Sequence, residues 1–92
     1  MALIWDTEKK EMIKVRSLKN FKVPHLPDLD FFVHKSYKRD GFTATERSTG
    51  SSVVAGKTSK VEAELQARER LNTVTPKKMQ EMINAALKEQ RR

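Results

Sequence analysis

The fold is decided by residues 31–47, which read FFVHKSYKRDGFTATER. Two runs rich in β-branched and aromatic residues flank Asp40-Gly41, a pair typical of a two-residue type I′ turn because both central positions need a positive φ. This turn fixes the register of the predicted hairpin. Lys35 then faces Glu46, and the two charges offset each other across the strands. We therefore predict an antiparallel hairpin centred on residues 40 and 41.

The predicted register sorts the hairpin into two faces, because side chains alternate along a strand. The face expected to contact the core carries Phe31, Val33, Tyr37, Phe42 and Ala44. The opposite face carries no acid and consists of His34, Lys38, Thr43, Thr45 and Arg47. We expect this second face to be exposed and basic. Rings at Phe32 and Tyr37 would then be available for stacking on bases.

The sequence that follows the hairpin predicts a third strand and a helix. Residues 49–51 form a second turn, and residues 52–55 form a short strand of the same meander, which Gly56 ends. The segment 59–62 reads SKVE and matches a capping box, so a helix begins there. This helix is expected to end near residue 72, and its large apolar residues are Val61, Leu65 and Leu71.

A second helix begins at Thr75 and Pro76, because threonine suits an N-cap and proline suits the first helical position. Apolar residues recur at helical spacing along it, which indicates an amphipathic helix. The stripe is expected to pack on the sheet, with a partner surface as the alternative. It consists of Met79, Met82, Ile83, Ala86 and Leu87.

The first thirty residues permit two interpretations. Alternation over residues 12–18 favours a strand that exposes Lys14 and Arg16 together, in a hairpin whose charged turn lies at residues 7–10. The alternative is a helix over residues 7–20. If the N-terminal strand packs beside the main hairpin, these two cations join its basic surface.

The elements together predict a single α+β domain over residues 1–92. It is an antiparallel β-meander, containing the Asp40-Gly41 hairpin, packed by two C-terminal helices. Residues 24–28 contain two prolines three positions apart and are expected to be an extended connection. A chain of 92 residues, 37% hydrophobic, has a modest core and little room for an enclosed substrate cavity. We therefore do not expect an enzyme.

Charge is the strongest functional signal. The chain has 19 lysines and arginines against 12 acids, a formal net charge of +7. Such an excess favours phosphate backbones or acidic protein surfaces as partners. Cysteine is absent, which fits a reducing cytoplasm. The N-terminal apolar run is too short for a signal peptide, and no stretch is long enough to span a membrane.

Catalytic and metal-binding motifs are weak. Residues 50–58 read GSSVVAGKT, but a P-loop needs four residues between its glycines and this segment has five. Lys57 and Lys60 lie beside a predicted helix N-terminus, where they can receive one phosphate or carboxylate. His25 and His34 are the only histidines and occur in different elements, so we expect no metal and no cofactor.

The chain resembles small orphan proteins of bacteriophages, and in particular the anti-CRISPR proteins that inhibit type I-F surveillance complexes. The resemblance covers size, charge and plan: a tight hairpin over residues 37–42, a short strand before Gly56 and a helix opened by residues 59–62. It implies a protein without enzymatic activity that docks on a Cas protein–guide RNA complex and blocks binding of target DNA. Mimicry of DNA by acidic residues is excluded, because this chain is basic.

We therefore expect a small basic protein that binds a nucleoprotein or a nucleic-acid backbone through several weakly specific cations. The alternative is a DNA-binding regulator or architectural protein of a mobile element, and a virion component is a third possibility. A basic strand face can also serve only to prevent edge-to-edge aggregation. The candidate contact residues are His34, Lys38, Arg39, Arg47, Lys14, Arg16, Lys57 and Lys60.

Overall fold

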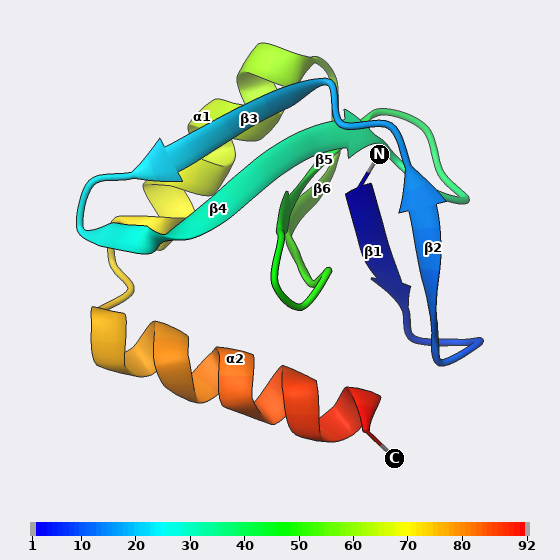
Figure 1. Ribbon diagram of the computed structural model, residues 1–92. Helices are drawn as coiled ribbons and strands as arrows, with labels where there is room; N and C mark the ends of the chain where they lie inside the picture. The colour runs from blue at the N-terminus through cyan, green and yellow to red at the C-terminus, as the bar shows by residue number, and fades with distance from the viewer. Residues whose placement is uncertain (1, 92) are drawn as a thin grey trace.

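The computed structural model describes residues 2–91, which form an α+β fold (Figure 1). The strands come first in the chain and the helices follow at its C-terminal end. The elements are β1 (Ala2–Asp6), β2 (Glu11–Val15), β3 (Lys19–Val23), β4 (Leu26–Lys35), β5 (Phe42–Glu46), β6 (Ser52–Lys57), α1 (Lys60–Leu71) and α2 (Pro76–Gln90).

The strands form two antiparallel sheets. A four-stranded meander has the order β3-β4-β5-β6, and β1 and β2 form a separate pair. This confirms the predicted class, an antiparallel meander packed by two C-terminal helices. It also confirms the N-terminal hairpin, whose turn spans residues 7–10, over the helix that was its alternative.

The β4–β5 hairpin has a different register from the one predicted. Val33 lies opposite Ala44, and Lys35 lies opposite Phe42 rather than Glu46. The displacement is an even number of residues, so the same side chains still share a face. The paired strand residues therefore share faces as predicted. Tyr37 was predicted on the core face but packs on the opposite one, beside Phe32, and the predicted Lys35–Glu46 pair is wrong.

The predicted type I′ turn at Asp40-Gly41 is also wrong. Positive φ angles occur at Lys38 (63°) and Gly41 (94°), and the Ser36 N–H donates to the Gly41 carbonyl at 2.9 Å. A Cβ on Gly41 would lie 2.5 Å from the carbonyl oxygen of Lys57. The glycine is therefore needed where the hairpin approaches β6, and not at the centre of a two-residue turn.

Strand β3 and the start of β4 replace the extended connection expected at residues 24–28. Phe21 lies opposite Phe31 and Val23 lies opposite Leu26, with an irregularity between the two pairs. Pro27 falls in that irregular stretch, where its missing N–H interrupts no regular ladder. The connection between the two strands is thus confined to residues 24 and 25.

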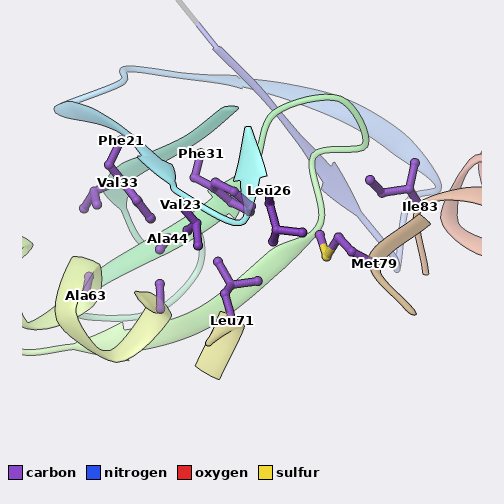
Figure 2. Packing of buried hydrophobic residues seen from close by; sticks show 11 residues of the cluster. Phe21, Val23, Leu26, Phe31, Val33, Ala44, Ala63, Leu71, Met79 and Ile83 are labelled. Atoms are coloured by element: carbon purple, nitrogen blue, oxygen red, sulfur yellow. The ribbon is translucent and has the colours of Figure 1, made fainter. Parts of the chain in front are cut away.

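Helix α1 packs on the meander through small residues. Ala63, Ala67 and Leu71 are buried, whereas Val61 and Leu65 are 73% and 49% exposed. The alanines allow the helix to approach the sheet closely, so the buried stripe is not the one marked by the largest apolar residues. Figure 2 shows Ala63 and Leu71 near the sheet residues of this core.

Helix α2 begins as predicted, because the Thr75 hydroxyl accepts from the Lys78 N–H at 3.1 Å. Met79 and Ile83 are buried in the same core, and Figure 2 shows Met79 beside Leu26. Met82, predicted to lie in the core stripe, is 48% exposed. The second helix therefore contributes a narrower apolar stripe than its sequence predicts.

The second face of the meander is covered by the β1–β2 pair. Phe32 is fully buried against Ala2 and Ile4, with Tyr37 packed beside them. The Trp5 N–H donates to the Gly50 carbonyl at 2.9 Å and ties β1 to the β5–β6 turn. The meander thus lies between α1 on one face and β1–β2 on the other (Figure 1).

Candidate nucleic-acid interface

The predicted basic face of the hairpin is largely buried. His34 is 1% exposed, and its Nδ1–H donates to the Lys35 carbonyl at 2.9 Å. Its Nε2 then accepts from the Thr45 hydroxyl at 2.7 Å. Burial lowers the pKa of His34, although the hydrogen bond to the Lys35 carbonyl opposes this shift. His34 therefore does not lie on an exposed face as expected, because β1–β2 covers this face.

Lys38 contacts acids of the chain itself. Its Nζ lies 3.4 Å from a Glu8 oxygen and 3.7 Å from Oδ2 of Asp6, both in or beside the β1–β2 turn. Burial acts to lower the pKa of Lys38, but the hydrogen bond to Glu8 and the charge of Asp6 outweigh it and raise the pKa. Lys38 therefore stays cationic, with its charge already neutralised.

Arg47 lies at the other end of β5 from Lys38 and Arg39. Its guanidinium stacks 4.8 Å from the centre of the Phe32 ring and donates to Oδ1 of Asn20 at 2.6 Å. Phe32 itself is fully buried, so it is no platform for a base, contrary to the prediction. Arg47 is separated from the hairpin loop by the whole of β5, about 17 Å of strand. The hairpin cations do not gather at one place.

Lys14 and Arg16 lie on the N-terminal hairpin and are exposed. Lys14 is opposite Leu3, which is 43% exposed, on the face of β1–β2 that points away from the meander. Arg16 follows the last residue of β2, so only Lys14 is placed on this face by the strand pairing. They do not join Lys38, because β1–β2 forms its own sheet and does not extend the meander.

Cations gather instead at the end of the meander where β4 and β6 finish and α1 begins. Lys35 and Lys57 both pair with Phe42, so the three side chains form a row on one face. Lys60 is the first residue of α1, and the side chain of Arg39 lies against Gly56. We call this cluster the cationic end; it consists of Lys35, Arg39, Lys57 and Lys60.

Charges at the cationic end are not neutralised by ion pairs. Within residues 2–91, no carboxylate lies within 4 Å of any of its four cationic groups. The acids at this end are Asp40, in the hairpin loop, and Glu62, whose carboxylate accepts from Gln66 Nε2 at 2.8 Å. Backbone N–H groups of the first turn of α1 add a partial positive charge. The arrangement can therefore bind several anionic groups at once.

A polar cleft of about 340 Å³ adjoins the cationic end. Its walls come from β1, the turn after it and the β4–β5 loop, and its floor comes from β4, β5 and β6. Arg39 borders both the cleft and the cationic end. Side chains lining the cleft include Trp5, Asp6, His34, Tyr37, Lys38, Arg39 and Thr45.

A smaller apolar groove of about 140 Å³ lies between the end of α1, the start of α2 and the β5–β6 turn. It is lined by Leu71, Val74, Met79, Met82 and Ile83, among others. None of the four residues of the cationic end lines this groove, so it is not part of the candidate interface.

Lys35 and the cleft residues Trp5 and Asp6 were not among the candidates predicted from the sequence. Lys35 was assigned to a pair with Glu46, so the correct register would have identified it as a free cation. Nothing in the sequence pairs the N-terminal residues with the β4–β5 loop. Within residues 2–91, no three metal-ligating side chains are placed to hold an ion, and neither helix is long and apolar enough to cross a membrane.

Comparison with known proteins gives no match to this chain among protein-family models, curated proteins or solved structures.

Proposed function

We propose that this chain is a small basic binding protein whose cationic end docks on the phosphate backbone of a nucleoprotein. The proposal is supported above all by the cluster of four cations at one end of the meander, which have no ion-pair partner among residues 2–91. Three of these cations, Arg39, Lys57 and Lys60, were candidates from the sequence. Bidentate contacts from arginine and point charges from lysine suit phosphate groups.

The geometry favours a flexible or single strand as the ligand. The row of Lys35, Phe42 and Lys57 crosses neighbouring strands about 4.8 Å apart and places a lysine on each side of Phe42, which is partly buried against the core. Such a combination contacts a backbone without reading base sequence. A specific target then depends on the shape and charge of the surrounding protein as well.

The specific partner proposed is a Cas protein–guide RNA surveillance complex, in the cytoplasm of a bacterial host. This part rests on the resemblance to anti-CRISPR proteins of the type I-F inhibiting kind and on the sign of the charge. The cationic end would contact guide RNA phosphates or acidic Cas surfaces and thereby block the entry of target DNA. The chain acts by occupancy and not by catalysis.

The first test measures binding to a labelled single-stranded RNA between 50 and 200 mM salt. Phosphate contacts release counterions, so the affinity should fall steeply as salt rises. Replacing Lys35, Lys57 and Lys60 by glutamine should reduce the slope of log affinity against log salt by about 2, or about 0.7 per lost contact. The matched control replaces Lys77, Lys78 and Lys88, exposed lysines of α2, and should leave the slope nearly unchanged. Equal effects of the two triple variants would refute an interface at the cationic end.

The second test measures target-DNA binding by a purified type I-F Cas protein–guide RNA complex. The wild-type chain should inhibit this binding, and the variant lacking the three lysines of the cationic end should inhibit at least tenfold less strongly. If the wild-type chain does not inhibit binding of target DNA, the Cas protein–guide RNA complex is not its partner. Strong binding to plain duplex DNA would favour the regulator instead.

A further inference from the structure

The cleft beside the cationic end contains a buried acceptor without a donor. Asp6 is 7% exposed, and its Oδ1 accepts from the N–H groups of Glu8 and Lys9 at 2.9 and 3.2 Å. Its Oδ2 is buried and accepts no hydrogen bond from the part of the chain that the structure describes. An unsatisfied buried acceptor is unfavourable, so a ligand that supplies a donor here gains affinity.

Lys38 covers this oxygen without satisfying it. The distance from its Nζ to Oδ2 of Asp6 is 3.7 Å, which is beyond hydrogen-bond length. The Lys38 side chain is 47% exposed and flexible, so a ligand can displace it outward. Its ammonium would then be free to meet an anionic group of the same ligand.

Asp6 is a carboxylate at neutral pH. Burial raises the pKa of Asp6, but the two backbone N–H donors and the charge of Lys38 outweigh it, and the pKa lies below its ordinary value. Oδ2 is consequently an acceptor only, and its ligand must present an N–H or O–H group.

The other lining groups indicate the kind of ligand. Tyr37 supplies an aromatic ring in the cleft, with Nζ of Lys38 5.3 Å from the ring centre, and Lys38 and Arg39 supply cations. A planar base beside the Tyr37 ring, with its phosphate at the cations, matches this combination. A volume of about 340 Å³ lies at the small end of the range for ligand pockets.

We propose that the cleft takes one unpaired nucleobase whose exocyclic amino group donates to Oδ2 of Asp6. This inference rests on the proposed function, since the base would belong to a strand whose phosphates lie on the cationic end. Arg39, which borders both features, contacts the phosphate that joins them.

The test uses nucleoside monophosphates, because they carry the base without the rest of the strand. Trp5 is the only tryptophan in the chain and lines the cleft, so its fluorescence reports occupancy directly. AMP should quench it in a saturable manner. Purine riboside monophosphate, which is AMP without the amino group, should bind about tenfold more weakly.

Asp6→Asn tests the acceptor itself. Asparagine keeps the oxygen that accepts from Glu8 and Lys9, so the turn is retained, but it can place a donor where Oδ2 was. This variant should bind the two nucleotides equally. Glu81→Gln, which changes an exposed acid of α2 outside the cleft, should preserve the tenfold preference.

Equal binding of AMP and purine riboside monophosphate by the wild-type chain, or the absence of saturable quenching, would overturn the inference. This comparison stands even if Asp6→Asn fails to fold. The salt dependence of RNA binding is measured on variants that leave the cleft intact, so that result tests the cationic end separately. A preference for AMP without salt-dependent RNA binding supports the cleft and refutes the proposed function.

Discussion

Glu46 is a single buried residue that organises the β5–β6 turn. Its side chain is 2% exposed and accepts from the backbone and hydroxyl groups of both Ser48 and Thr49, at 2.6 to 3.1 Å. Four donors on one carboxylate satisfy its charge without a cation. This explains how an acid can lie in a sheet otherwise surrounded by apolar side chains.

Replacing Glu46 by glutamine should destabilise the fold by about 1–3 kcal/mol, because an amide nitrogen would face donors in a buried site. Urea unfolding at neutral pH measures this loss. Glu69→Gln, at an exposed position of α1, is the control and should change stability by less than about 0.5 kcal/mol. A loss equal to that of the control would show that the four hydrogen bonds contribute little.

How well each site residue could be predicted from the sequence depended on whether its environment is local in the chain. Lys57 and Lys60 were identified correctly as cations beside a helix N-terminus, because the capping signal at residues 59–62 is local. His34 was misplaced because its burial depends on strand β1, thirty residues away. Asp6 was missed because its unsatisfied oxygen exists only in the folded arrangement.

At the level of the elements, helix starts were the most predictable features. The Ser59 hydroxyl accepts from the Glu62 N–H at 3.1 Å, which is the serine half of the predicted capping box, whereas the Glu62 side chain accepts from Gln66 Nε2. The strand register was less predictable, because Gly41 has two uses that the sequence does not distinguish, a turn centre and a close approach to β6. The even displacement of the register preserved the faces, so the core was predicted better than the pairing.

Ser59→Ala should cost about 1 kcal/mol, because the first turn of α1 would lose its side-chain acceptor. The free energy of unfolding from chemical denaturation measures the change. Thr58→Ala is a matched control at an exposed neighbouring position, and it should have a much smaller effect. A larger loss for Thr58→Ala than for Ser59→Ala would contradict the assignment of the cap.

The backbone carbonyl groups at the C-terminal end of helix α1 are hydrogen-bonded by a residue from another part of the chain. His25 Nε2 lies 3.0 Å from the Leu71 carbonyl oxygen and 2.9 Å from the Val74 carbonyl oxygen, so its N–H donates to this pair. The short connection between β3 and β4 therefore positions the end of α1. The sequence analysis noted His25 only as unsuited to a metal site.

At the scale of the whole molecule, ion pairs fasten α1 to the edge of the meander. Glu64 accepts from Lys19 on β3 and from Arg68, whose Nε lies at 2.8 Å. The hydrogen bond from Lys19 lowers the pKa of Glu64, burial opposes this shift, and Arg68 adds to it. A lowered pKa means that the folded state binds the proton less readily than the unfolded chain does.

Stability from Glu64 should therefore be complete above its ordinary pKa of about 4.3 and should decline as the pH falls through the lowered value. Glu64→Gln should cost up to about 1 kcal/mol at pH 7, because Lys19 is largely exposed. The difference in stability between the wild type and this variant should shrink as the pH falls through the lowered pKa of Glu64. Thermal unfolding at several pH values measures it, and a gap independent of pH would contradict the assignment.

The hydrogen bond between the Trp5 N–H and the Gly50 carbonyl affects which substitutions the chain tolerates at position 50. A Cβ at position 50 would lie 2.7 Å from the backbone nitrogen of Trp5, and the glycine has a φ of 71°. Any larger residue at position 50 would push the β1–β2 pair away from the meander. The packing of the two helices on the meander would remain. The cleft would lose one wall before the body of the protein lost its shape, so binding and folding can fail separately.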